Sequence, residues 1–316
     1  MSRLEILRAG IGQHHEVLEV GPYFNPIAPR RDGYRVTTID VFDTEELRRR
    51  ATTDPNLGPD RVPGIEDVDL VGSACDLADL TVAKYGAGRK FDWILSSHNF
   101  EHLPDPIRFL QQCAAVLGAT GTLRMAVPDK RYCFDHFRRI SDVSEWLQAF
   151  HERRTKPTIY QVFREEALRS TPGNDGCWIP ARQTLAFYRS WFGPNGCVPE
   201  VYVDTHCWAF TPESFELLLH DVRAFGLVPL RIGRISEPHG NEFFVDLSPA
   251  DVHESFSEDD YFSTRESLLR RCQAAETPHQ GSRRHSHSRR RGIPSKVLRE
   301  ATRVARQVAA LGSWQR

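Results

Sequence analysis

The stretch that decides the fold is His15-Glu16-Val17-Leu18-Glu19-Val20-Gly21, an apolar run that ends in a glycine turn. Such a run is typical of a buried β-strand. Three further runs of this kind follow, at residues 34–40, 91–97 and 121–128, and residues 106–117 have the pattern of a helix. Strands that alternate with helices predict an α/β fold: a Rossmann-like, mostly parallel sheet with helices on both faces.

The sheet pattern returns near the end of the chain. Thr211 suits an N-cap and Pro212 the first position of a helix, and apolar residues recur at helical spacing after them. Residues 227–235 and 242–247 then suit two strands joined by a turn. We therefore expect the sheet to end in an antiparallel pair of strands.

The composition is that of a globular protein. Of 316 residues, 40% are hydrophobic and 26% are charged, which excludes a wholly disordered chain. No apolar run reaches the roughly 18–20 residues of a membrane-spanning helix, and the N-terminus lacks the layout of a secretory signal. The seven cysteines form no C-x-x-C pair, which argues against a zinc ribbon or a disulfide framework. We predict a cytoplasmic protein with reduced thiols.

The predicted organisation has five consecutive parts that differ in composition. They are the first half of the sheet domain (1–130), a mainly helical insertion or acceptor lid rich in aromatic residues and arginine (131–205), the rest of the sheet domain (206–250), a polar and partly disordered linker with a short helix (251–293) and a basic amphipathic helix (294–316). Within the first part, residues 51–72 are rich in Pro, Gly and Asp and predict a surface loop.

Residues 277–316 carry an excess of basic charge. They hold ten of the 41 basic residues and one of the 42 acidic ones, so the rest of the chain has a net charge of −10. This is not the layout of a general nucleic-acid binder, whose basic surface lies on the folded domain. From Pro294 onward apolar residues form one helical stripe with basic residues opposite, which suits a peripheral contact with the anionic inner face of a membrane. Packing on the chain itself or on a partner is the alternative.

The expected ends of the strands hold candidate ligand groups, because ligands of open parallel sheets bind beyond the carboxyl ends. Gly21 permits a tight turn and a close approach of the backbone. Asp40 follows it by 19 residues and could accept both hydroxyl protons of a ribose, and Asp76 could take an adenine amino group. Neither the further glycines of G-x-G-x-x-G nor a G-x-x-x-x-G-K-[ST] loop is present. The pattern favours a ligand with ribose and adenine but no pyrophosphate.

Four blocks follow one another along the chain: residues 17–22, 91–105, 121–135 and 204–212. In this order they resemble the motifs of class I S-adenosylmethionine-dependent methyltransferases, over about residues 14–248. Pro22 and residues 24–26 stand where that family usually has further glycines. This variant of the first block, together with the block at residues 204–212, resembles a bacterial subgroup associated with cell-surface polysaccharide synthesis.

The resemblance implies S-adenosylmethionine as the cofactor, with residues 1–130 as the half that binds it. Glu19 would support the glycine turn, Gly21 would pass under the carboxypropyl part of the cofactor, and Asp40 would bind its ribose hydroxyls. The cofactor-binding residues predicted in this way are Glu19, Gly21, Pro22, Asn25, Asp40, Asp76, Leu77, Ser97 and His98. Of these, Asp76 and Leu77 would flank the adenine.

Four residues are predicted to be catalytic: His98, His206, Asp129 and Arg131. His98 would lie beside the transferred methyl group. His206 could act as a general base, because a neutral imidazole accepts a hydroxyl proton near pH 7. The alternative for His206 is a buried histidine hydrogen-bonded to Asp204.

The segment after residue 128 is dense in charge. Arg131 could grip a carboxylate or phosphate of the acceptor bidentately. The alternative is that Asp129, Arg131 and Asp135 form a salt-bridge network that holds the insertion to the sheet. Both interpretations stay open on the sequence.

His98 and His102 stand four residues apart, which on a helix would place them on one face. This spacing suggests a metal site, but no third ligand follows at a suitable distance, so the sequence predicts no metal. Glu101 is interpreted as a capping acid at a helix N-terminus, and His102 as a structural residue beneath that helix.

The function predicted is methyl transfer from S-adenosylmethionine to a small acceptor, with O-methylation of a saccharide favoured by the subgroup resemblance alone. One alternative is a catalytically silent, methyltransferase-like scaffold in a polysaccharide-assembly complex, suggested by the altered glycine loop. A nicotinamide-dependent oxidoreductase is a third hypothesis, which the missing glycines disfavour.

Overall fold

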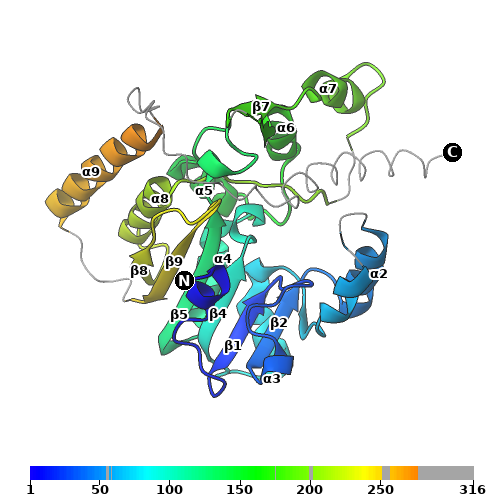
Figure 1. Cartoon of the computed structure of the whole chain (residues 1–316). Coiled ribbons are helices and arrows are strands. Elements are labelled where there is room, and N and C mark those ends of the chain that lie inside the picture. The colour runs from blue at the N-terminus through cyan, green and yellow to red at the C-terminus, as the bar shows by residue number, and fades with distance from the viewer. Residues whose placement is uncertain (55–56, 58, 175, 199–201, 251–256, 277–316) are drawn as a thin grey trace.

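The structure is a computed structural model that describes residues 1–54, 57, 59–174, 176–198, 202–250 and 257–276. A seven-stranded sheet of order β3-β2-β1-β4-β5-β9-β8 lies at its centre (Figure 1). The strands are β1 (Glu16–Val20), β2 (Arg35–Asp40), β3 (Leu70–Val71), β4 (Phe91–Ser97), β5 (Leu117–Pro128), β8 (Leu230–Ile235) and β9 (Glu242–Pro249). Strands β1 to β5 pair in parallel, while β9 is antiparallel to both β5 and β8. The predicted Rossmann-like sheet with a terminal antiparallel pair is confirmed.

The described helices surround the sheet. They are α1 (Arg3–Arg8), α2 (Thr44–Thr53), α3 (Leu77–Tyr85), α4 (Pro106–Val116), α5 (Val143–His151), α6 (Ile159–Leu168), α7 (Thr184–Phe192), α8 (Pro212–Ala224) and α9 (Glu258–Glu276). Helix α8 begins as predicted, because the Thr211 side chain accepts a hydrogen bond from the Ser214 N–H and Pro212 is the first helical residue. Asp105 caps α4 in a similar way by accepting from the Arg108 N–H.

The two faces of the sheet bury separate hydrophobic clusters, because side chains alternate along each strand. On β1, Leu18 and Val20 belong to the larger cluster, which helices α3, α4, α5 and α8 complete. Val17 points to the other face and joins a smaller cluster with Leu7 of α1 and Ile27 of the loop after β1. Among the described residues, the second face is therefore covered by a short helix and a loop.

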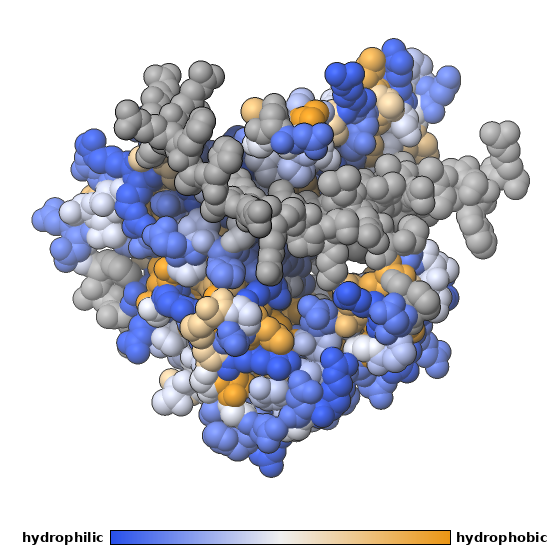
Figure 2. Space-filling model, in the orientation of Figure 1, coloured by the Kyte–Doolittle hydropathy of each residue, from blue (hydrophilic) through white to orange (hydrophobic). Residues whose placement is uncertain are grey.

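The regular structure described within the predicted insertion (131–205) is mainly helical, and Figure 1 shows its helices α6 and α7 beyond the edge at which β4 and β5 end. It contains α5 to α7 and a short hairpin of β6 (Ser170–Pro172) and β7 (Trp178–Pro180). Val162, Phe187 and Trp191 form a small core of its own. In the space-filling view hydrophobic residues lie among hydrophilic ones over α7 (Figure 2).

Two segments differ from the expected pattern. The predicted surface loop at residues 51–72 contains the end of α2, a 3₁₀ turn at Pro59–Gly64 and the edge strand β3, which is only two residues long. The helix expected within residues 251–276 is α9, which is 19 residues long and packs on α8, where Asp221 pairs with Arg265 at 3.0 Å. The division into five parts stays a prediction.

No described helix combines the length and the apolar character that crossing a membrane requires. The predicted amphipathic helix at residues 294–316 lies outside the described residues. The expected cytoplasmic location and peripheral membrane contact therefore stay predictions.

Candidate functional site

The carboxyl ends of β1 and β2 lie side by side. Val20 is in register with Ile39, and the N–H of Gly21 donates to the Ile39 carbonyl at 2.8 Å. Asp40 is the last residue of β2, so it lies at the same edge of the sheet as the glycine bend. Gly21 has a φ of +60°, in the left-handed region that favours glycine.

The segment after β4 contacts this bend. A Cβ placed on Gly21 would lie 3.5 Å from the side-chain Oδ1 of Asn99, so the Asn99 side chain lies against the bend. Beyond the bend, the Asn25 N–H donates to the Pro22 carbonyl at 3.0 Å and closes a tight turn. Pro22 and Asn25 therefore shape the loop, whereas Asn99 is a residue at the bend that the sequence analysis missed.

Glu19 anchors the loop that follows the bend. Its buried carboxylate accepts hydrogen bonds from the N–H groups of Ile27 at 2.6 Å and Ala28 at 3.0 Å. Burial raises the pKa of Glu19 to about 7, although both hydrogen bonds favour the charged form. No α-helix lies between β1 and β2 in this fully described stretch. The carboxylate of Glu19 therefore fixes the loop by hydrogen bonds where an α-helix is missing.

Replacing Glu19 by glutamine is expected to flatten the pH dependence of folding stability. The folded pKa of about 7 lies above the ordinary 4.5, so the folded state holds the proton more tightly. This contribution is complete below about pH 4.5 and is lost as the pH rises to about 7, which corresponds to about 3 kcal/mol. The amide also leaves one loop N–H without its acceptor, at a cost of about 1–3 kcal/mol.

Urea unfolding of the wild type and Glu19→Gln at pH 5 and pH 8 measures this effect. The wild type should lose more stability than the variant between the two pH values. Parallel losses in both proteins would show that Glu19 does not titrate in this way.

The three residues predicted to bind the ribose and the adenine, Asp40, Asp76 and Leu77, differ in their surroundings. Burial raises the pKa of Asp40 to about 6, and its Oδ1 accepts from the Phe42 N–H at 3.1 Å. Asp76 precedes α3 and pairs with Arg108 at 2.5 Å. Leu77 is fully buried in the larger hydrophobic cluster. Leu77 can therefore offer a ligand its backbone but not its side chain.

Ser97 and His98, at the end of β4, are tied to other elements. Arg3 of α1 donates to Oγ of Ser97 and, through Nε, to Oε1 of Glu242 at 2.7 Å. Nε2 of His98 lies 2.8 Å from Oε2 of Glu242, and His98 has a left-handed φ of +49°. Glu242 at the start of β9 thus orients both Arg3 and His98. The sequence analysis missed it because it lies 144 residues after His98.

Asp129 and Arg131 form a closed pair at the end of β5. The guanidinium of Arg131 donates to both oxygens of the fully buried Asp129, at 2.9 and 2.6 Å. It also lies 3.8 Å from the carboxylate of Glu213 on α8. This geometry matches the salt-bridge alternative for these two residues, so binding of an acceptor by Arg131 stays a prediction.

His206 is buried, but its partner is not the one expected. Its Nδ1 lies 2.6 Å from Oδ2 of Asp135, which pairs with Arg138 at 2.8 Å. Asp204 lies instead 2.9 Å from Nδ1 of His102. The alternative in which Asp204 holds His206 is therefore wrong, because the two aspartates serve different histidines.

Glu101 does not cap a helix. Residues Phe100–His102 form a 3₁₀ turn, and the carboxylate of Glu101 is buried among imidazoles. Its Oε1 lies 3.8 Å from Nε2 of His102 and 3.8 Å from Nε2 of His206. The cap of the following helix is Asp105. His98 and His102 do not share a helical face, since His98 precedes this turn.

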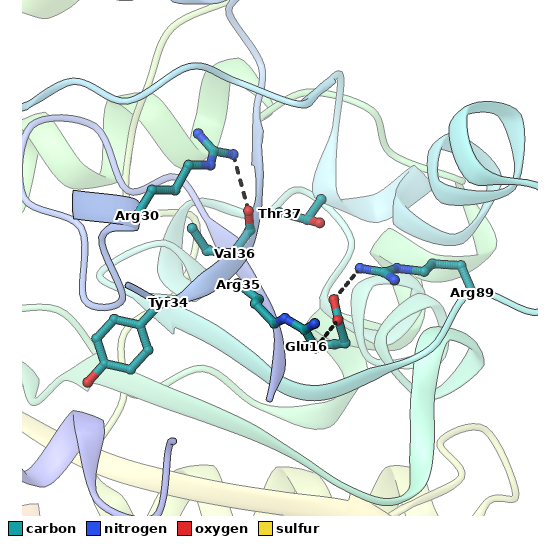
Figure 3. Close-up of a pocket in the computed structure, with 7 residues that line it drawn as sticks. All are labelled: Glu16, Arg30, Tyr34, Arg35, Val36, Thr37 and Arg89. Atoms are coloured by element: carbon teal, nitrogen blue, oxygen red, sulfur yellow. Dashed lines mark hydrogen bonds and ion pairs between the residues drawn. The ribbon is translucent and has the colours of Figure 1, made fainter. Parts of the chain in front are cut away.

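A shallow hollow at the opposite edge of the sheet is lined mainly by residues at the start of β1 and β2 (Figure 3). Its charged groups are already paired, since Arg35 and Arg89 contact Glu16 at 3.2 and 2.6 Å and Arg30 contacts Asp69. Ligands of parallel sheets bind at the carboxyl ends instead. The candidate site is therefore the edge formed by Gly21, Asp40 and His98.

Several solved structures are similar to this chain. A methyltransferase from Methanosarcina mazei is 18% identical with a TM-score of 0.39, covering 78% of this chain and 98% of that one. The CcbJ methyltransferase from Streptomyces caelestis is 11% identical with a TM-score of 0.39, covering 78% and 94%. A structure titled "DhpI-SAM-HEP complex" is 16% identical with a TM-score of 0.39, covering 78% and 83%. Similarity at this level carries no conclusion about function.

No curated protein matches the chain. The model of a protein family described as "Methyltransferase domain" matches residues 3–223, which is more than half of the chain and includes all three strand ends of the candidate site. The chain therefore belongs to the methyltransferase-domain family.

Proposed function

We propose that the protein transfers a methyl group from S-adenosylmethionine to a hydroxyl group of a small acceptor, and that this acceptor is a saccharide or a related molecule. The observation that carries the proposal is the meeting of the Gly21 bend and Asp40 at one edge of the sheet. Family membership makes the chain a methyltransferase, whose cofactor is S-adenosylmethionine.

The cofactor fits the groups at this edge. A backbone bend without a Cβ accepts the amino-acid part at close range, and a carboxylate one strand away accepts the ribose hydroxyl protons. The bound cofactor supplies an activated methyl group. Gly21 and Asp40 bind and orient it, while His98 lies at the end of the adjacent strand β4.

The acceptor site is proposed to lie between this edge and the insertion. Two aromatic side chains of the segment 131–205 pack against histidines. Phe134 packs on His206 with ring centroids 4.5 Å apart, and Trp178 stacks on His136 at 5.2 Å. Flat rings of this kind present large apolar faces beside polar groups. Such faces suit the apolar side of a sugar ring, which supports the saccharide proposal.

A hydroxyl acceptor needs a group that takes its proton. Nε2 of His98 is hydrogen-bonded to Glu242. In His206 the hydrogen bond to Asp135 is made by Nδ1, so Nε2 takes no part in it. Asp135 fixes the tautomer and orientation of the imidazole, as a carboxylate does for a catalytic histidine. We therefore assign proton acceptance to Nε2 of His206.

The other two hypotheses are less well supported. Membership of a methyltransferase-domain family favours an enzyme over a silent scaffold. A nicotinamide dinucleotide carries a pyrophosphate, and the bend after β1 holds a single glycine followed by Pro22.

Isothermal titration of the purified chain with S-adenosylhomocysteine is expected to show one binding site with a Kd below ~100 μM, within the usual range of metabolite affinities. Methyl transfer to a panel of sugars and glycosides, read as release of S-adenosylhomocysteine, then tests the acceptor. Absence of binding heat would overturn the cofactor assignment. Binding without turnover on any panel member would favour the scaffold.

A further inference from the structure

Three side chains lie close together next to the 3₁₀ turn that follows β4: Glu101, His102 and His206. One ligand atom from each lies within 4.8 Å of the other two. Oε1 of Glu101 lies 3.8 Å from Nε2 of both histidines. Ligand atoms around a tetrahedral zinc ion with bonds of ~2.1 Å are ~3.4 Å apart. Small side-chain movements would therefore bring all three atoms within bonding distance of one ion.

Glu101 lacks the partners that a buried carboxylate needs. It is 1% exposed, and neither of its oxygens has a hydrogen-bond partner among the residues that the structure describes. A buried charge without hydrogen bonds is costly. The groups that face it are imidazole nitrogens, including Nδ1 of His98 at 3.7 Å. A divalent cation among these groups would supply the missing partner.

Both histidines have a carboxylate on the nitrogen that points away from Glu101. Nδ1 of His102 lies 2.9 Å from Asp204, and Nδ1 of His206 lies 2.6 Å from Asp135. Only the contact of His206 has the geometry of a hydrogen bond, whereas that of His102 with Asp204 is an ion-pair contact. Histidines that bind metals usually donate their other N–H to a carboxylate, which fixes the tautomer and makes the ligating nitrogen more basic, and His206 has this arrangement. The Nε2 atoms of both histidines face Oε1 of Glu101.

The charges around the cluster favour a cation. Three carboxylates, those of Glu101, Asp135 and Asp204, stand against one guanidinium, that of Arg138. A histidine that binds a metal ion must be neutral, and with both imidazoles neutral two negative charges are left to balance in these contacts. A divalent ion would balance them.

The backbone holds the cluster together. The carbonyl of Glu101 accepts from the N–H groups of Cys207 at 2.7 Å and Trp208 at 3.3 Å. The His206 N–H donates to the buried Glu165 at 2.5 Å. The 3₁₀ turn after β4 and the loop before α8 (202–211, the late loop) are thus joined next to the ligands, as a preorganised metal site requires.

We propose that Glu101, His102 and His206 bind one divalent transition-metal ion, with zinc as the closest chemical match. Two imidazoles and one carboxylate form the donor set of open zinc sites, which keep a further position for water or a substrate oxygen. The sequence analysis predicted no metal because the third ligand comes from a distant loop rather than from the spacing of His98 and His102.

This inference deepens the proposed function and rests on it in one respect. If the chain methylates a hydroxyl group, the open position can take the acceptor oxygen, and a bound cation lowers the pKa of that hydroxyl. Nε2 of His206 would then be a metal ligand rather than the base, and the proton of the acceptor hydroxyl would pass to solvent water as the oxygen attacks the methyl group. Metal binding itself is measured without any methyl transfer.

The test uses the untagged full chain, freed of metal with a chelator and titrated with zinc sulfate by calorimetry. We expect one equivalent of zinc per chain, retained through gel filtration and counted by mass spectrometry. Cobalt(II) should give visible absorption bands of a four- or five-coordinate site, without the near-ultraviolet band of a thiolate ligand. The last point excludes binding by the exposed Cys177 and Cys197.

Glu101→Gln and His206→Gln are each expected to weaken zinc binding at least ~100-fold, since loss of a group that only hydrogen-bonds to a ligand already costs 10–100-fold. His136→Gln is the matched control. His136 lies in the same part of the chain but contacts the Arg131 carbonyl and Trp178 instead of the cluster. Circular dichroism tests whether each variant is folded. Asp135→Asn keeps all three ligands and is expected to weaken zinc binding less than loss of a ligand does, by about 10–100-fold.

Three results would overturn the proposal. One is less than a tenth of an equivalent of bound zinc in the wild type, which would mean that imidazolium ions balance the carboxylates. Another is equal zinc affinity of the wild type and folded His206→Gln, which would place the ion elsewhere. The third is a thiolate band in the cobalt spectrum. Each is independent of S-adenosylhomocysteine binding, so the proposed function can stand if the metal site fails.

Discussion

Asp40→Ala is expected to lower the affinity for S-adenosylhomocysteine at least ~100-fold. The carboxylate would accept hydrogen bonds from both ribose hydroxyls, and hydrogen bonds to a charged group contribute about 1.5–3 kcal/mol each. Their loss corresponds to a factor of 100 or more in Kd. Calorimetric titration of the wild type and the variant at pH 7.5 measures the difference.

The pH dependence of binding gives a second readout for the same residue. Burial raises the pKa of Asp40 to about 6, so the carboxylate that accepts hydroxyl protons is mostly charged at pH 7.5 and mostly neutral at pH 5. The wild type should therefore bind S-adenosylhomocysteine about tenfold more weakly at pH 5. Asp40→Asn, which has no charge to lose, should show no such change.

The matched control is Asp259→Ala. Asp259 is an exposed aspartate in the first turn of α9, away from the ends of β1 and β2. Its replacement should leave the affinity unchanged. Equal affinities of Asp40→Ala and the wild type would remove Asp40 from the cofactor site, even if the family assignment holds.

The strands of the sheet could be predicted because their apolar runs end at clear turns. The stretch that ends at Gly21 forms β1, and residues 91–97 form β4 with the bounds expected. Strand β3 could not be predicted in this way, because two residues, Leu70 and Val71, show no periodicity. Its pairing with β2 is a tertiary contact that only the folded sheet supplies.

The candidate site also contains contacts that could be predicted from the sequence and contacts that could not. Gly21 and Asp40 could be predicted to meet, because the carboxyl ends of neighbouring parallel strands share one edge. The partners of the histidines could not, because they come from distant segments. Asp204 precedes His206 by two residues in the sequence, yet it contacts His102. Sequence proximity suggested a pairing with Asp204, whereas His206 is hydrogen-bonded to Asp135, 71 residues before it.

The second large effect is expected at Asp135. The carboxylate is buried against Arg138 and His206, and these partners hold its pKa below the usual range although burial opposes the charged form. Asp135→Ala leaves the guanidinium of Arg138, which is 2% exposed, without its charged partner. Removing one member of a buried ion pair costs about 3–5 kcal/mol. Urea unfolding in the presence of a chelator measures this loss without any contribution from metal.

Two comparisons separate the unpaired charge from a general effect of mutation at this site. Glu266→Ala breaks an exposed pair with Arg270 on α9 and should cost about 1 kcal/mol or less. Asp135→Asn combined with Arg138→Met removes both charges and should recover much of the stability lost in Asp135→Ala, because a buried pair is replaced at little net cost when both members go. If the double variant is as unstable as Asp135→Ala, the unpaired charge is not the cause of the loss. The cause would then be the lost hydrogen bonds, because Arg138 donates to the His206 and Cys207 carbonyls at 2.8 and 3.1 Å and methionine cannot.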